Sequence, residues 1–159
     1  MRLGAEFIYR AVIMDVFTRD IRGWQLGRTL DQALTLTALQ RAFAHRTPIM
    51  HHSDQGMQYA APEYIQTLQA AGVQISMAAV GDPRQHGYAE RVIRTIKEEE
   101  INLTEYHDFP DALAQIGRFI DDVYRTKRIH SALGYLTPVE FKAAWRREHG
   151  NEGSPLKPR

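Results

Sequence analysis

The stretch from Ile49 to Met77, IMHHSDQGMQYAAPEYIQTLQAAGVQISM, decides the fold class of this 159-residue chain. It begins with a short apolar strand, residues 49–52, which runs into the turn-forming tetrapeptide 53–56. A helix follows from Pro62, a residue favoured at the first helical position, and Gly72 ends it. Residues 73–77 then alternate in polarity as a strand does. A strand, a helix and a second strand in succession indicate an α/β protein.

The segments on either side extend this order. Residues 7–16 and 21–26 are rich in β-branched and aromatic residues and predict a hairpin, and a helix capped by Asp31 reaches Ala44. Beyond the second strand, the breaker-rich residues 81–87 predict a loop. Three helices are expected after that loop: residues 88–103, residues 111–125, and a last helix from Pro138, capped by Thr137, to Arg147. The predicted architecture is a mixed sheet flanked by helices.

Length and composition limit the classes of function. Hydrophobic residues make up 43% of the chain and charged residues 25%, values typical of a globular domain. We expect residues 1–148 to form that domain and residues 149–159 to be a disordered tail. No window approaches the ~18 apolar residues of a membrane span, and no secretory leader is recognisable, so a cytoplasmic protein is expected. The absence of cysteine excludes disulfides and Cys-ligated zinc, and a net charge of +1 gives no indication of nucleic acid.

Two carboxylates are candidates for chemistry. Asp54 follows directly after a strand end, where open α/β sheets bind ligands, although the same residues also suit a plain turn. Glu90 lies near the start of a helix, where the helix dipole favours an acid in any case. The offset of 90 − 54 = 36 residues spans a turn, a helix, a strand and a loop, which returns the chain to the same crevice. Two converging carboxylates suit Mg²⁺ or Mn²⁺ and, with a third, typically hold the metals of phosphoryl transfer.

Several motifs together resemble one family. They are HHSDQGMQY at residues 51–59, GYAER at 87–91 running into TIK at 95–97, AVIMDVFTR at 11–19, and the Tyr, His-Ser, Leu-Gly and Thr-Pro pattern of residues 124–141. Over residues 6–145 the chain is similar to bacterial insertion-sequence transposases of the retroviral-integrase-like DDE superfamily. That resemblance implies an RNase H-like core and Mg²⁺-dependent DNA strand cleavage and transfer in transposition and DNA integration. It also implies a D-D-35-E triad in which Asp54 is the second Asp and Glu90 is the Glu.

The resemblance further implies that one part of the family's core is absent. The family's first catalytic Asp lies on the first strand, far enough before the second Asp to fall ahead of Met1. We therefore expect a chain truncated at its N-terminus, without the central first strand, whose neighbouring strands keep unpaired inner edges. Asp15 matches a family Asp in the second strand and is interpreted as structural. His86 and Arg91 depart from the family pattern and leave the local geometry open.

DNA contacts are implied for residues near Glu90. Arg94 and Lys97 lie four and seven positions after it, on one helix face, although a solvated surface would show the same spacing. Arg84 and Gln85 lie on the preceding loop, where contacts with phosphates are expected. The implied partners are the double-stranded DNA ends of an insertion element, and a second copy of the chain or the intact transposase, in the cytoplasm of a bacterium at its nucleoid.

Two other functions stay open. A truncated fragment without catalysis that binds only DNA or intact transposase keeps the same fold, and the missing Asp is what favours it. A zinc hydrolase built from histidines is the weaker alternative, because neighbouring side chains on a strand point to opposite sides. Its candidate ligands are His51, His52, His86 and His130.

Overall fold

The computed structural model describes residues 1–44, 46–54, 56–77 and 83–150, and for residues 83–86 it describes the backbone alone. Its elements alternate strands and helices as the sequence predicts. The predicted tail falls almost wholly in residues 151–159, which lie outside the described part. No helix within the described ranges is long and apolar enough to cross a membrane.

The N-terminal part consists of two antiparallel hairpins. Strands β1 (Arg2–Leu3) and β2 (Glu6–Phe7) pair first, and β3 (Tyr9–Met14) then pairs with β4 (Ile21–Gly27). This confirms the hairpin predicted for residues 7–26, with its first strand divided in two. The pairing starts at Tyr9 and Gly27 and shifts register between Ile13 and Met14, just before the turn.

The stretch from Ile49 to Met77 folds as the predicted strand, helix and strand. Strand β5 (Met50–Ser53) and β6 (Gln74–Met77) pair in parallel, and α2 (Pro62–Ala70) connects them. Tyr64 and Leu68 on α2 are buried. They pack with Leu36 and Leu39 of α1 (Gln32–Phe43), the helix capped by Asp31. The antiparallel and parallel ladders together confirm the mixed α/β architecture.

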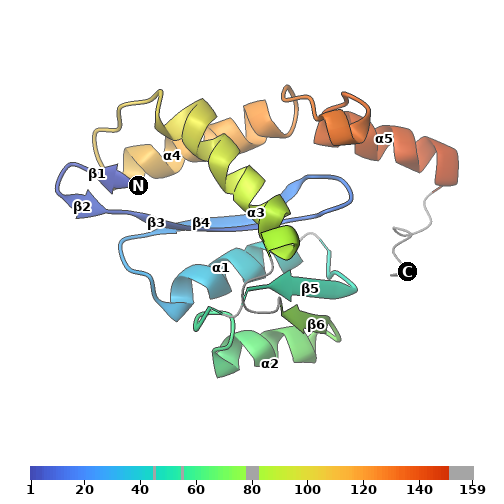
Figure 1. Cartoon of the computed structure of the whole chain (residues 1–159), viewed down its shortest axis with the longest axis horizontal. Coiled ribbons are helices and arrows are strands. Elements are labelled where there is room, and N and C mark those ends of the chain that lie inside the picture. The colour runs from blue at the N-terminus through green and yellow to red at the C-terminus, as the bar shows by residue number, and fades with distance from the viewer. Residues whose placement is uncertain (45, 55, 78–82, 151–159) are drawn as a thin grey trace.

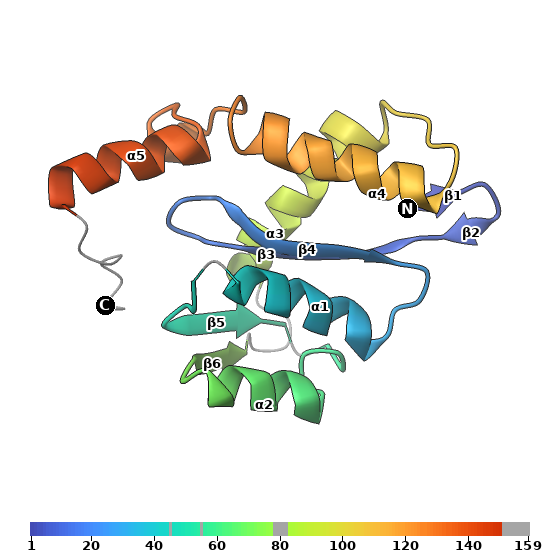
Figure 2. The ribbon, with the colours of Figure 1, turned by 180° about the vertical axis from the view of Figure 1, so that it is seen from behind.

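The β3–β4 hairpin lies between two layers of helices (Figures 1 and 2). On one face, Ala11 packs against Leu34 and Ala38 of α1. On the other face lie α3 (Pro83–Ile96) and α4 (Phe109–Arg118), which are joined to the hairpin by one hydrophobic core. That core includes Ile8, Ile21 and Leu26 from the strands, and Val92, Ile96, Ala112 and Ile116 from the helices. The hairpin is therefore the centre of the fold.

One edge of β3 and one edge of β5 are unpaired among the described residues. Among the described residues, β3 pairs only with β4 and β5 pairs only with β6, so the two ladders form separate sheets. Helix α1 bridges them, because Leu34 and Ala38 pack under β3 while Leu36 and Leu39 pack against α2. The sheet is thus interrupted between β3 and β5.

Helix α3 differs from its prediction at both ends. It begins at Pro83, within the segment predicted as a loop, so Arg84 and Gln85 lie in its first turn. Proline has its φ angle already set for a first helical position, and an interior Gly87 costs only about 1 kcal/mol. At its other end α3 continues into a π-helical turn, η1 (Lys97–Ile101), and α4 likewise continues into η2 (Phe119–Tyr124). The helix predicted for residues 111–125 begins two residues earlier, because Asp108 caps it.

The last helix, α5 (Pro138–His149), begins as predicted. The Thr137 side chain accepts a hydrogen bond from the Glu140 N–H, and the Glu140 carboxylate accepts one from the Thr137 N–H. This reciprocal capping box satisfies donors that the first helical turn leaves unpaired. A short 3₁₀ turn, η3 (Ser131–Leu133), precedes it. Helix α5 extends to one side of the molecule (Figure 1).

Candidate active site

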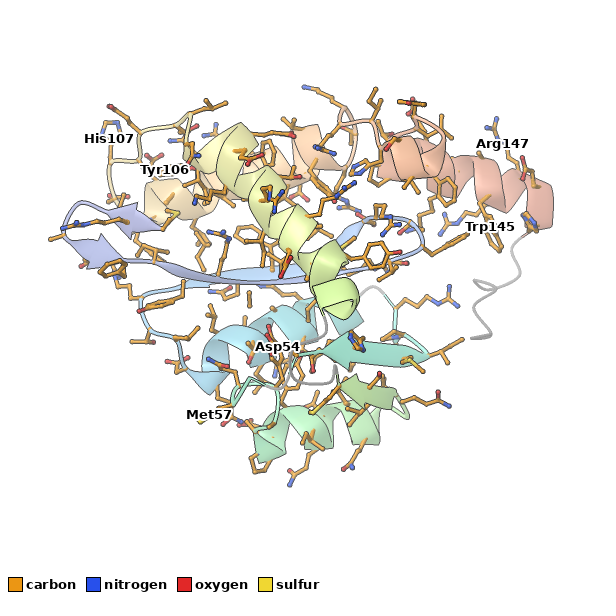
Figure 3. All side chains as sticks on the ribbon, in the orientation of Figure 1. Asp54, Met57, Tyr106, His107, Trp145 and Arg147 are labelled. Carbon is orange, nitrogen blue, oxygen red and sulfur yellow. The ribbon has the colours of Figure 1, made fainter. Side chains whose placement is uncertain are left out.

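Asp54 lies in a tight turn directly after β5. Its Oδ1 atom accepts a hydrogen bond of 2.8 Å from the Gly56 N–H, and the Gly56 carbonyl accepts one from the Tyr59 N–H. A Cβ atom at Gly56 would lie 2.8 Å from Asp54 Oδ1, so any other residue there would displace the Asp54 carboxylate from its hydrogen bond. The carboxylate is exposed, beyond the end of the strand (Figure 3). One carboxylate oxygen thus holds the turn, and the other accepts no hydrogen bond from the described residues.

Two buried aromatic side chains, His51 and Tyr64, lie next to this turn. His51, on β5, and Tyr64, on α2, are both buried, and His51 Nε2 lies 3.0 Å from the Tyr64 hydroxyl. Burial, with a contribution from His52, lowers the pKa of His51 to about 4, so its imidazole is neutral at pH 7. Burial likewise raises the pKa of Tyr64. The Tyr59 ring packs edge-on against Tyr64 at 5.5 Å, which ties the turn to α2.

Glu90 is placed by helix α3. Val92 and Ile96 on this helix are buried in the core, while Glu90, Arg94 and Lys97 are exposed. The beginning of α3 is also held by the turn between β3 and β4, because the Arg19 guanidinium lies 4.2 Å over the Tyr88 ring. The helix thus turns Glu90 and the two predicted DNA-contacting cations away from the core. The side chains of Arg84 and Gln85 lie outside the described residues.

Asp15 serves the turn between β3 and β4. Its Oδ1 accepts hydrogen bonds from the backbone N–H groups of Phe17 at 2.9 Å and Thr18 at 3.3 Å. The neighbouring Arg19 has a φ of 59°. Such a left-handed conformation is uncommon for a side chain other than glycine and is stabilised here by the surrounding turn. The structural interpretation of Asp15 therefore fits its contacts.

The described histidines have other contacts. His51 pairs with Tyr64, His52 Nδ1 lies 3.0 Å from the Ser76 hydroxyl, and the His130 ring packs edge-on against Tyr124 at 5.2 Å. His86 has no described side chain. Within the residues whose side chains are described, no three His, Asp or Glu side chains are grouped as a metal site. These contacts give the zinc hydrolase no support.

The donor chemistry of the two carboxylates fits a divalent cation. Neither the Asp54 Oδ2 atom nor the Glu90 carboxylate has a hydrogen-bond partner among the described residues. Exposed carboxylate oxygens are the hard ligands that Mg²⁺ and Mn²⁺ prefer, and such ions keep water molecules in their remaining positions. Asp54 belongs to the β5–β6 sheet, whereas Glu90 belongs to a helix packed on the β3–β4 sheet.

Sequence reasoning missed the contacts that position these residues. The sequence marks His51 as a motif residue and candidate zinc ligand and Tyr64 as part of a helix, and no pattern predicts the hydrogen bond between them. The Arg19–Tyr88 contact and the ion pair between Arg125 and Asp20, 105 positions apart, likewise have no local signal. Arg128 likewise forms a hydrogen-bonded ion pair with Glu99, 29 positions away.

Comparisons with known proteins agree with this architecture. Residues 1–83 match the family model for the integrase core domain, and residues 71–138 match a second model of the same description. The transposase for insertion sequence element IS904 of Lactococcus lactis is 34% identical over 138 residues, covering 85% of this chain and 54% of the relative. The transposase for IS629 of Shigella sonnei is 30% identical over 148 residues, covering 92% and 50%. The chain thus spans about half the length of these relatives.

Solved structures show the same fold. The catalytic core domain of BIV integrase superposes with a TM-score of 0.64 at 16% identity, covering 94% of this chain and 93% of that one. The HTLV-2 integrase catalytic core in complex with magnesium gives a TM-score of 0.66 at 13% identity, covering 89% and 88%. The fold is therefore the RNase H-like fold of integrase cores, and the chain belongs to the integrase core domain family.

Proposed function

We propose that this chain contributes the catalytic core of a bacterial transposase, which cleaves and transfers DNA strands with Mg²⁺ or Mn²⁺. One observation carries the proposal: two exposed carboxylates, 36 residues apart, stand where a strand ends and on the helix that follows the next strand. The insertion-element relatives support the reaction class. They favour it over a fragment that binds DNA without catalysis.

Each proposed residue has a defined role. Asp54 and Glu90 would hold the ion, which when bound activates an attacking oxygen and stabilises the leaving oxygen of a phosphodiester. The Gly56 N–H fixes one oxygen of Asp54, so the carboxylate has a restricted orientation. The Arg19–Tyr88 contact orients the first turns of the helix that carries Glu90. Both restraints reduce the reorganisation that ion binding requires.

Four residues are proposed to contact DNA phosphates. Arg94 is exposed on the same helix as Glu90, Lys97 is exposed at the start of η1, which continues that helix, and Arg84 and Gln85 lie in the first turn of α3. Cations beside a metal site hold the phosphodiester in register without reading its sequence. The proposed substrate is therefore the double-stranded end of an insertion element. A second copy of the chain or an intact transposase in the bacterial cytoplasm is the proposed partner, since one HTLV-2 integrase core is described as dimeric.

We also propose that residues 1–159 hold two of the triad's three carboxylates. The same match of Asp54 and Glu90 to the family triad leads us to propose a domain of residues 1–148 that lacks the family's first strand. The purified chain is then expected to bind Mn²⁺ and to nick DNA only weakly, since loss of one catalytic group commonly costs ~10²–10³ in rate. Strong Mn²⁺-dependent nicking that Asp54→Asn abolishes would show that another residue supplies the third carboxylate.

A Mn²⁺ titration followed by electron paramagnetic resonance tests the site. Asp54→Asn and Glu90→Gln are each expected to weaken binding at least tenfold, since both change one ligand of the same ion. Asp15→Asn is the matched control, because the Asp15 carboxylate already caps a turn. Equal losses in all three variants, or none in the first two, would contradict the proposed site.

A further inference from the structure

The turn between β3 and β4 gathers cations around one buried carboxylate. The Asp20 side chain is 4% exposed and accepts hydrogen bonds from Arg125 Nε at 2.8 Å and Arg125 Nη2 at 3.3 Å. Arg22 Nη1 lies 3.5 Å from the same carboxylate. Arg125 also reaches the exposed Asp121 at 3.4 Å. Two arginines therefore share Asp20, and neither is fully neutralised by it.

Helix α5 adds two further cations to this turn. The Phe17 ring, in the turn, packs edge-on against Phe141 at 5.2 Å and Trp145 at 5.9 Å. These contacts hold the helix in place, and each aromatic residue is followed directly by a cation, Lys142 or Arg146. The two cations are four positions apart, so they lie one above the other on one side of the helix. Arg22, Arg125, Lys142 and Arg146 are called here the α5 cation cluster.

The cluster carries more positive than negative charge. Its four cations face two carboxylates, Asp20 and Asp121. In the described part of the chain, no carboxylate lies within ion-pairing distance of Lys142 or Arg146. Burial lowers the pKa of Lys142, and Arg22, Arg146 and Arg125 lower it further against an opposing effect of Asp20. Of the two acids on α5, Glu140 is held by Thr137 at the start of the helix, and Glu148 lies in its last turn.

Such crowding has a physical cost that an anion would relieve. Like charges in a half-buried position repel one another more strongly than they would in bulk water. The arginine side chains are only 15% exposed at Arg22 and 31% at Arg125, whereas Arg146 is exposed and Lys142 half-buried. The cluster is therefore shielded from solvent near Asp20 and accessible to solvent along α5. An anion approaching along the helix would meet Lys142 and Arg146, which form no ion pair with a carboxylate of the described residues.

We propose that the α5 cation cluster binds the phosphates of the DNA backbone, an inference that rests on the proposed action on DNA. Trp145 and Arg147 mark α5 at one end of the molecule, away from Asp54 (Figure 3). A duplex held there is contacted outside the carboxylate pair, independently of any metal. The cluster anchors DNA without reading its sequence, because arginine and lysine contacts with phosphates carry no base information.

Duplex binding measured against salt in EDTA tests the cluster separately from the metal site. The full chain is titrated with a short duplex of arbitrary sequence, as wild type, as Lys142→Gln/Arg146→Gln and as Lys142→Ala/Arg146→Ala. Removing two phosphate contacts is expected to lower the slope of log K against log salt by about 1.8, at ~0.9 for each contact. Arg2→Gln/Arg28→Gln is the matched control, because it removes the same charge from exposed residues near the β1–β2 end.

Each outcome decides the proposal. A lower slope in both cluster variants with an unchanged slope in the control supports it, and circular dichroism confirms that the variants fold. Unchanged slopes in the cluster variants, or equal losses in the control, overturn it. The Mn²⁺ titration reports separately on Asp54 and Glu90. A chain that binds Mn²⁺ but keeps its salt slope therefore loses this proposal and retains the proposed function.

Discussion

The two proposed ligands belong to regions that are held together in different ways. Glu90 rests on the larger region, where β3, β4, α3, α4 and η2 share one core and ion pairs link distant segments. Asp54 rests on the smaller β5–α2–β6 region, where a few apolar side chains and one buried hydrogen bond hold a parallel strand pair. The carboxylate of the larger region thus depends on long-range contacts, and that of the smaller region on a tight turn.

The distance between the two carboxylates therefore depends on how the two regions pack against each other. Helix α1 connects the two regions, since it packs on the hairpin with one side and on α2 with another. Ile13 of β3 packs both against the group of Ala11, Leu34 and Ala38 and against the group that includes Leu39 and Tyr64. With β3 and β5 unpaired towards each other, no backbone hydrogen bond in the described ranges fixes this spacing. Among the described residues, side-chain packing and a hydrogen bond from Gln32 of α1 to Glu63 of α2 set the relative position of the two regions.

Gly23→Ala is expected to have the largest effect on stability, because it disturbs the packing of α1 against the hairpin. A Cβ atom at Gly23 would overlap the carbonyl oxygen of Ala38 and lie 2.7 Å from the Ala42 nitrogen on α1. Helix and strand must separate, so unfolding free energy is expected to fall by about 3 kcal/mol or more, at the upper end of overpacking costs. Urea denaturation measures it. Gly117→Ala is the control, because there the nearest atom is the tip of the Trp24 ring, and a change within about 1 kcal/mol is expected.

Acid is expected to weaken the smaller region through His51. Its pKa is about 4 when folded, below the ordinary value of 6.5 that it regains on unfolding. The unfolded chain therefore binds a proton first as the pH falls, and stability present above pH 6.5 is lost progressively towards pH 4. Urea denaturation between these pH values is expected to show that the free energy of unfolding falls by roughly 1–3 kcal/mol. His130 also has a pKa lowered to about 4, so His51→Asn is expected to reduce the dependence on pH without removing it. An unaltered dependence would contradict the assignment to His51.

Tyr64→Phe is expected to lower the free energy of unfolding by a smaller amount, about 1–2 kcal/mol. The variant keeps the ring but removes the hydroxyl that lies against His51, which leaves a buried imidazole nitrogen without a partner. The loss belongs to the smaller region, so hydrogen exchange is expected to accelerate in β5 and not in α3. Tyr106→Phe is the control, since the Tyr106 hydroxyl reaches the half-buried Glu100 in the larger region. Equal acceleration in both regions would contradict the division drawn between them.

Local features of this fold were predictable and long-range ones were not. The capping box of Thr137 and Glu140, the Asp31 cap and the start of α2 at Pro62 depend on neighbouring residues, and all are confirmed. The start of α3 has a local signal in Pro83, which the breaker-rich residues around it outweighed, whereas the π-helical turns have no local signal. Asp54 and Glu90 were indicated by their spacing and the family motifs. Their supports were not, because Arg19 and Tyr88 approach one another only in the folded chain.

Arg19→Leu is expected to have the smallest effect on stability and a specific effect on position. The half-buried Arg19 over the exposed Tyr88 ring is expected to contribute about 1 kcal/mol, so the melting temperature changes little. The contact holds the beginning of α3, however, so faster hydrogen exchange is expected over residues 87–92 while α4 keeps its rate. Arg19→Lys retains a cation over the ring and is expected to restore much of the protection. If exchange in α3 is the same with Leu and with Lys, the buried side chains Val92 and Ile96 alone position the helix that carries Glu90.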